Sequence, residues 1–112
     1  MTSVDSKVVF ITGGGQGIGA EVARRLHAKG AKLVLTDLDA AALAERSAEL
    51  GGDEHVLTVV ADVRDLAAMQ AAAAKAVEKF GGIDTVVANA GIASYGSVLH
   101  VDPDAVKRVL DV

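Results

Sequence analysis

The sequence predicts an α/β fold in which helices cover a doubly wound parallel sheet. Four short, unbroken runs of apolar residues alternate with longer segments whose apolar residues recur every three or four positions. The unbroken runs are typical of strands buried on both faces, and the longer segments are typical of amphipathic helices. A glycine-rich turn joins the first strand to the first helix. Because crossovers between parallel strands are right-handed in nearly all proteins, this alternation favours a doubly wound topology.

The expected strands are rich in Val, Leu and Ile, and helices are expected between them. The strands span residues 8–12, 32–37, 56–62 and 85–88. In the first helix, Ile18, Val22 and Leu26 are four residues apart and predict an apolar face, and a glycine ends the helix. The second helix is expected to begin after Asp39 as its N-cap and to end at the glycine pair 51–52.

The third helix is expected after Asp65, and its apolar stripe is interpreted as a core face. The stripe consists of Leu66, Met69, Ala73, Val77 and Phe80. The segment Asp102-Pro103-Asp104 combines an N-cap with a proline at the first helical position, so a fourth helix is predicted there. The sequence ends at Val112, inside or just after that helix.

Composition excludes several classes of function. The 112 residues fit one domain, and a net charge of −4 with scattered Lys and Arg disfavours nucleic acid as a partner. The chain has no cysteine, and His27, His55 and His100 are too dispersed to hold a metal ion. No apolar run approaches about 18 residues, and no secretory signal opens the sequence, so we expect a soluble cytoplasmic protein without a membrane partner.

The glycine-rich turn runs from Thr12 to Gly19 with the sequence TGGGQGIG. Glycines at a strand-to-helix junction let the backbone turn tightly and let a pyrophosphate approach, while free N–H groups and the helix dipole attract the anion. No Lys-Ser or Lys-Thr pair follows the last glycine, which argues against a nucleoside triphosphate P-loop.

The second expected strand ends at Asp37, eighteen residues after Gly19. A dinucleotide-binding fold places an acid at about this distance, where its carboxylate accepts hydrogen bonds from the adenosine ribose hydroxyls. Neither Gln16 nor Leu38 offers a cation for a 2′-phosphate, so NAD is favoured over NADP. The alternative is that Asp37 caps the next helix or faces water.

Three motifs in register make the chain resemble the short-chain dehydrogenase/reductase family. They are the Thr-Gly-x-x-x-Gly-x-Gly spacing of residues 12–19, the pair Asp62-Val63, and Asn89-Ala90-Gly91. The resemblance covers the chain from about Lys7 to Val112. It implies a Rossmann-like sheet truncated after the fourth strand and the following helix, with residues 1–112 as the dinucleotide-binding portion of a single-domain enzyme.

The resemblance also implies cofactor-binding roles for twelve residues. The glycine turn would cradle the pyrophosphate, Asp37 would hold the adenosine ribose, the pair after the third strand would receive the adenine edge, and the last residue would lie near the nicotinamide. These residues are Gly13, Gln16, Gly17, Ile18, Gly19, Asp37, Asp62, Val63, Asn89, Ala90, Gly91 and Val112. Taken alone, Asp62 is equally compatible with a helix cap, and Asn89 with a hydrogen-bonded turn.

The catalytic residues of the family cannot be placed in this sequence. Family members resemble one another in a catalytic Asn, a Ser and a Tyr-x-x-x-Lys pair, whereas Tyr95, the single tyrosine, has Leu99 four residues later. The resemblance places the catalytic Asn at the position after Val112. We therefore expect no catalytic residue in the chain, and interpret it as part of a longer enzyme.

Three functions are compatible with these observations. The first is an NAD-dependent oxidoreductase that moves hydride between nicotinamide and an alcohol or ketone, with this chain supplying the cofactor-binding half and homo-oligomerisation implied by the resemblance. The second is a non-catalytic nucleotide-binding or interaction module. The third is a methyltransferase-like fold for S-adenosylmethionine, against which the Asn89-Ala90-Gly91 motif argues.

Overall fold

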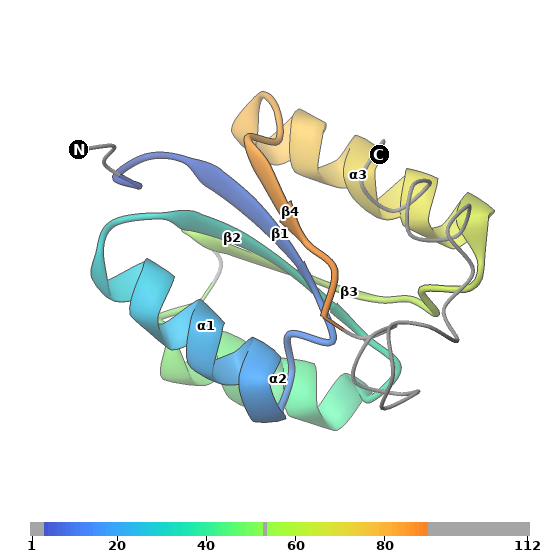
Figure 1. Cartoon of the computed structure of the whole chain (residues 1–112), viewed down its shortest axis with the longest axis horizontal. Helices are drawn as coiled ribbons and strands as arrows, with labels where there is room; N and C mark the ends of the chain where they lie inside the picture. Colours follow the sequence, from blue (N-terminus) through green and yellow to red (C-terminus); the bar gives the residue numbers. More distant parts are fainter. Residues whose placement is uncertain (1–3, 53, 90–112) are drawn as a thin grey trace.

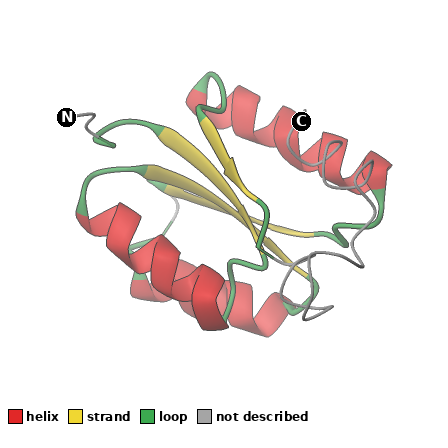
Figure 2. Ribbon diagram, in the orientation of Figure 1, coloured by secondary structure: helices red, strands yellow, loops and turns green. Residues whose placement is uncertain are grey.

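The computed structural model describes residues 4–52 and 54–89, which form a parallel sheet between two layers of helices (Figure 1). The four strands are arranged in the order β3-β2-β1-β4, and each pair of neighbours is parallel. Helices α1 and α2 lie on one face of the sheet and α3 lies on the other (Figure 2). This arrangement confirms the α/β, Rossmann-like fold class. In the part of the chain described, no helix is both long and apolar enough to cross a membrane.

Two of the four predicted strands have the predicted bounds, and the other two are shorter. The strands are β1 (Val8–Thr12), β2 (Lys32–Asp37), β3 (Val56–Val60) and β4 (Thr85–Val87). β3 ends two residues earlier than predicted because the carboxylate of Asp62 accepts the N–H of Arg64, which turns the backbone out of the ladder. β4 ends one residue early because the N–H of Asn89 turns toward the side-chain oxygen of Thr12.

The helices are α1 (Gly17–Ala28), α2 (Ala40–Glu49) and α3 (Leu66–Phe80). The predicted aspartate cap at Asp39 is confirmed, and Asp65, after which the third helix was expected, also proves to be an N-cap. Asp39 accepts the N–H of Ala42 at 3.1 Å, and Asp65 accepts the N–H of Ala68 at 3.1 Å. The predicted fourth helix lies outside the described residues.

Alternate residues of β1 separate the core into two layers. Val9 and Ile11 pack with residues of α1, α2 and β2, whereas Val8 and Phe10 pack with residues of α3. Every residue of β1 is buried, which explains why the strand reads as an unbroken apolar run. β1 is therefore the central element on which both helical layers rest.

The predicted apolar stripes are wrong at three positions. Ile18, Leu66 and Val77 are 72%, 40% and 51% exposed. A residue advances about 100° around a helix, so spacings of four drift off the buried face and place Val77 about 80° from Met69. The buried faces consist mainly of alanines, which let the helices approach the sheet closely; their members are Ala20 and Ala23 in α1 and Met69, Ala72, Ala73 and Ala76 in α3.

The different burial of two residues on α3 gives the first prediction. Met69→Ala removes a 1% exposed side chain and should lower the free energy of unfolding by about 2–5 kcal/mol, because it leaves a cavity. Val77→Ala changes an exposed side chain on the same helix and should change that free energy by less than about 0.5 kcal/mol. Urea unfolding followed by circular dichroism measures both, and equal losses would contradict this assignment of the buried face.

Candidate functional site

Polar and glycine residues gather where the four parallel strands end. Thr12 closes β1 and Asp37 closes β2, while Asp62 and Asn89 each lie two residues after a strand, β3 and β4. Because parallel strands end at one edge of the sheet, these residues lie along the same edge. The predicted site residues among those described therefore share one side of the molecule.

The turn after β1 depends on glycine at particular positions. Gly13 and Gly17 have φ angles of 66° and 60°, in the left-handed region that glycine adopts readily. Gly19 is required for a different reason, because a Cβ there would overlap the carbonyl oxygen of Gly13 and lie 2.9 Å from Nδ2 of Asn89. The turn is thus held tightly between the start of α1 and the end of β4.

The first turn of α1 differs from the first turns of the other two helices. Its N-cap residue, Gln16, has extended backbone angles, and its side chain makes no capping hydrogen bond to the described residues. Asp39 and Asp65, by contrast, cap α2 and α3 with their side chains. Within the described residues, the first turn of α1 therefore has no side-chain cap, and the positive end of the helix dipole lies behind its N–H groups.

The carboxylate of Asp37 connects this turn to the end of β2. Its Oδ2 accepts the N–H of Gly15 at 3.1 Å, and its Oδ1 accepts the N–H of Asp39 at 3.1 Å. Asp37 is partly exposed, and Asp39 rather than Asp37 caps α2. The helix-cap alternative for Asp37 is therefore wrong. The carboxylate lies directly beside the glycine turn.

Thr12 and Asn89 fasten the turn to the end of β4. The buried hydroxyl of Thr12 donates to the carbonyl oxygen of Val87 at 3.4 Å and accepts the N–H of Asn89 at 3.0 Å. Nδ2 of Asn89 donates to the carbonyl oxygen of Gly13 at 3.4 Å. Sequence reasoning gave Thr12 no role of its own, although a threonine that ends a buried strand and opens a glycine turn is a usable signal.

Asp62 is held by a cation that the sequence reasoning did not identify. Its Oδ2 pairs with Nη2 of Arg64 at 2.8 Å, and its Oδ1 accepts the Arg64 backbone N–H at 2.9 Å. The side-chain hydrogen bond from Arg64, reinforced by the backbone one, lowers the pKa of Asp62. Asp65 caps α3, so the helix-cap alternative for Asp62 is wrong. Val63 is partly buried and packs against the core layer beneath α3.

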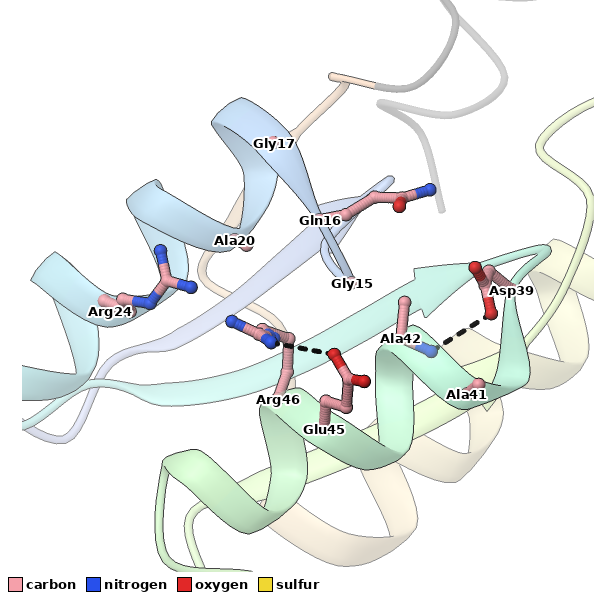
Figure 3. A pocket seen from close by; sticks show the side chains of 10 residues that line it. All are labelled: Gly15, Gln16, Gly17, Ala20, Arg24, Asp39, Ala41, Ala42, Glu45 and Arg46. Carbon is pink, nitrogen blue, oxygen red and sulfur yellow. Dashed lines mark hydrogen bonds and ion pairs between the residues drawn. The ribbon is translucent and has the colours of Figure 1, made fainter.

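A cavity of about 320 Å³ lies beside the glycine turn, between α1 and α2 (Figure 3). Its lining combines the turn with the small residues of both helices and with four charged side chains. The lining residues are Gly15, Gln16, Gly17, Ala20, Arg24, Asp39, Ala41, Ala42, Glu45 and Arg46. Neither arginine was singled out as a site residue in the sequence.

The structure therefore brings most of the predicted site residues together. Those at the glycine turn and the strand ends are Gly13, Gln16, Gly17, Ile18, Gly19, Asp37, Asp62, Val63 and Asn89. Ala90, Gly91 and Val112 lie outside the described residues. Within residues 4–52 and 54–89, no group of three or more His, Cys, Asp or Glu side chains is arranged to hold a metal ion.

Comparison with known proteins gives one consistent family. A family model described as short chain dehydrogenase matches residues 7–112. Dehydrogenase/reductase SDR family member 7B from Bos taurus is 41% identical over 115 residues, covering 96% of this chain and 35% of that protein. A crystal structure titled short-chain dehydrogenase/reductase SDR, glucose/ribitol dehydrogenase, from Brucella melitensis is 34% identical with a TM-score of 0.81, covering 96% of this chain and 48% of that one.

A second similar structure was solved with a cofactor bound. It is a short chain dehydrogenase/reductase from Burkholderia phymatum in complex with NAD, 31% identical with a TM-score of 0.78, covering 97% of this chain and 43% of that one. The fold and the glycine turn define the class of protein as a Rossmann-like α/β protein of the nucleotide-binding type. Within that class, the chain belongs to the short-chain dehydrogenase/reductase family of oxidoreductases and corresponds to its N-terminal part. It spans less than half the length of these relatives.

The close contact between Gly19 and Gly13 gives the second prediction. Gly19→Ala should lower the free energy of unfolding by about 1–3 kcal/mol, because the added Cβ meets backbone that has little room to move. Gly82→Ala is the matched control, since a Cβ at Gly82 meets nothing within 4 Å. Chemical denaturation of the two variants makes the comparison. A Gly19→Ala protein as stable as the control would refute the close contact.

The ion pair of Asp62 gives the third prediction. Arg64→Met should raise the pKa of Asp62 toward its ordinary value of 3.8, because the principal hydrogen-bond donor is removed. A carboxyl pKa lowered by folding stabilises the protein above the ordinary pKa, and this contribution is lost as pH falls through the lowered value. The ¹³C NMR titration of the carboxyl carbon measures the shift, with Arg25→Met as a control that leaves Asp62 untouched. An unchanged pKa would rule out Arg64 as the cause.

Proposed function

We propose that this chain binds NAD and forms the cofactor-binding half of an NAD-dependent oxidoreductase that interconverts an alcohol and a ketone. The observation that carries this proposal is the uncapped first turn of α1 beside the carboxylate of Asp37. Free helix N–H groups favour a pyrophosphate, and a carboxylate at the end of the second strand favours ribose hydroxyls. The groups proposed to bind the pyrophosphate and the adenosine ribose thus lie next to each other.

The glycine turn fits a pyrophosphate sterically as well as electrostatically. A Cβ added to Gly17 would meet nothing within 4 Å, so the space above the turn is open, yet its φ of 60° favours glycine. In the proposal, the backbone of Gly13, Gln16, Gly17, Ile18 and Gly19 approaches the pyrophosphate. The side chain of Ile18 is 72% exposed and does not belong to the core.

Asp37 retains the hydrogen-bonding capacity that a ribose needs. Each carboxylate oxygen has two lone pairs, and one backbone N–H occupies a single lone pair on each oxygen of Asp37. A second acceptor site per oxygen remains for the two ribose hydroxyls. A 2′-phosphate would instead meet this negative charge, and the neighbouring Leu38 is an apolar residue that is 65% exposed. These features favour NAD over NADP.

The remaining assignments follow the family resemblance. Asp62 and Val63 are proposed at the adenine edge, and Asn89 beside the cofactor at the end of β4. Ala90, Gly91 and Val112, outside the described residues, keep their predicted roles next to the ribose and the nicotinamide. Bound NAD would supply a hydride acceptor at nicotinamide C4, while the residues of this chain bind and orient it.

The reaction of the whole protein is part of the same proposal. The resemblance assigns proton transfer to a Tyr-x-x-x-Lys pair, which this sequence does not contain at Tyr95. Residues 1–112 are therefore proposed as the dinucleotide-binding portion of a single-domain, homo-oligomeric cytoplasmic enzyme acting on a small alcohol or ketone. In this proposal, the proton transfer depends on residues outside 1–112.

The test of this proposal, and the fourth prediction, compares the two dinucleotides. The protein should bind NAD at least about tenfold more tightly than NADP, and Asp37→Asn should weaken NAD binding by about 10- to 100-fold, because charged hydrogen bonds are lost. The same substitution should lower the affinity for NADP less, so the preference for NAD over NADP should become smaller. Isothermal titration calorimetry measures all four affinities.

Glu54→Gln is the matched control for charge. It removes one negative charge from an exposed residue just before β3, at the opposite edge of the sheet from Asp37. Both affinities should remain as in the unchanged protein. Equal binding of NAD and NADP by the unchanged protein would overturn the assignment of Asp37, and failure to bind either would overturn the proposed function.

A further inference from the structure

The two helices that flank the proposed phosphate and ribose sites are joined by a charged bridge. Nε of Arg24, on α1, donates to Oε1 of Glu49, on α2, at 2.8 Å. Nη1 of Arg46, also on α2, donates to the same oxygen at 3.2 Å. Glu49 thus accepts from both arginines at once, and we call these three residues the interhelical bridge.

The bridge lies beside the cavity, where the two helices are separated by space rather than by packed side chains. The uncharged residues of α1 and α2 that line the cavity are Gly17, Ala20, Ala41 and Ala42, all small. Figure 3 shows Arg24 coming from α1 and Arg46 from α2 on the side of the cavity away from Asp39. These small side chains leave space between the helices at this place, and the ion pair of Arg24 with Glu49 joins the helices across their outer side.

The cavity itself is poorly suited to bind a free anion. Its lining contains two arginines, Arg24 and Arg46, and two acids, Asp39 and Glu45, so the formal charges cancel. The arginines are also engaged, since Arg24 pairs with Glu49 and Arg46 pairs with both Glu45 and Glu49. The arginines therefore act within the protein.

The position of Arg46 is costly for a residue that only adds stability. Its side chain is 14% exposed, and its Nε is buried without a hydrogen-bond partner among the described residues. A buried guanidinium with an unmatched donor is weak evidence for stabilisation, because an apolar side chain of similar size would avoid the desolvation penalty. The pairs of Arg46 lie within α2, and one of them holds Glu49, the carboxylate that accepts from Arg24 of α1.

We propose that the interhelical bridge is a positioning element that fixes α1 against α2. Because α1 begins at the glycine turn and α2 begins just after Asp37, the bridge would set the separation between the free N–H groups of α1 and the Asp37 carboxylate. This inference rests on the proposed function. It predicts that loss of the bridge weakens the binding of a ligand that contacts both the α1 N–H groups and Asp37. The binding of a ligand that contacts only Asp37 should not change.

The neighbouring residue supplies the matched control. Arg25 is 77% exposed and pairs with Glu21 at 3.0 Å, entirely within α1. Arg24→Met and Arg25→Met therefore remove the same charge and one or more exposed ion pairs from adjacent positions, but only Arg24→Met breaks a link to α2. A third variant, Glu49→Gln, weakens the bridge from the other helix.

The fifth prediction distinguishes an effect of the bridge on the placement of the two subsites from an effect on the stability of the fold. Arg24→Met and Glu49→Gln should each weaken NAD binding by about two- to fivefold, the range expected for a half-exposed ion pair, while adenosine binding is unchanged. The double variant Arg24→Met/Glu49→Gln should lose no more NAD affinity than the weaker-binding single variant. Arg24→Lys should retain part of the NAD affinity that Arg24→Met loses. Calorimetry for NAD and ligand-observed NMR for adenosine give the ratio, and thermal unfolding is recorded in parallel.

Three outcomes would overturn the proposal. If Arg24→Met lowers the unfolding temperature but leaves the ratio of NAD to adenosine affinity as in Arg25→Met, the bridge only stabilises the fold. If NAD and adenosine weaken together, the bridge does not set the separation of the two subsites. Unchanged protein that binds neither ligand overturns the proposed function, and the role of the bridge with it, so the two failures are distinguishable.

Discussion

The contact between Gly13 and Gly19 is the constraint on which the rest of the site depends. The chain leaves the fully buried strand β1, turns and enters α1 within four residues, and the helix can come this close only because Gly19 has no side chain. That approach lets Asn89 reach the carbonyl oxygen of Gly13 and lets Gly15 donate to Asp37. The turn therefore touches the ends of both strands that neighbour β1, and a displacement of α1 would alter contacts on each side.

The N-terminus of α1, at the candidate binding site, differs from the N-termini of α2 and α3 in how it is capped. The side chains of Asp39 and Asp65 each accept one first-turn N–H, of α2 and α3 respectively, so these ends are capped by the protein itself. At α1 the equivalent position is Gln16, whose side chain does not cap within the described region. An uncapped helix end forgoes about 1 kcal/mol of stability, which an external anion can restore on binding. The proposed cofactor and the fold are thus linked energetically as well as spatially.

Much of this arrangement could be predicted from the sequence, because it depends on local signals. Asp39 was identified as a cap, the start of α3 was placed after Asp65, and β1, β2 and the glycine turn were located correctly, since each depends on residue type and short spacing. The apolar stripes failed at Ile18 and Val77, because a mostly alanine face lets larger side chains remain outside. The pairing of Asp62 with Arg64 and the bridge from Arg24 to Glu49 depend on side-chain geometry that spacing alone does not specify.

The order of the strands sets where the two ends of the proposed cofactor would lie. The connections run outward from β1 to β2 and β3, and the chain then crosses back over the sheet to β4 on the other side of β1. Ligands of open parallel sheets bind where this reversal occurs, which here lies between the ends of β1 and β4. The Thr12 hydroxyl joins those two ends directly. Under the proposed function, adenosine would therefore lie toward β2 and β3 and nicotinamide toward β4, on either side of the glycine turn.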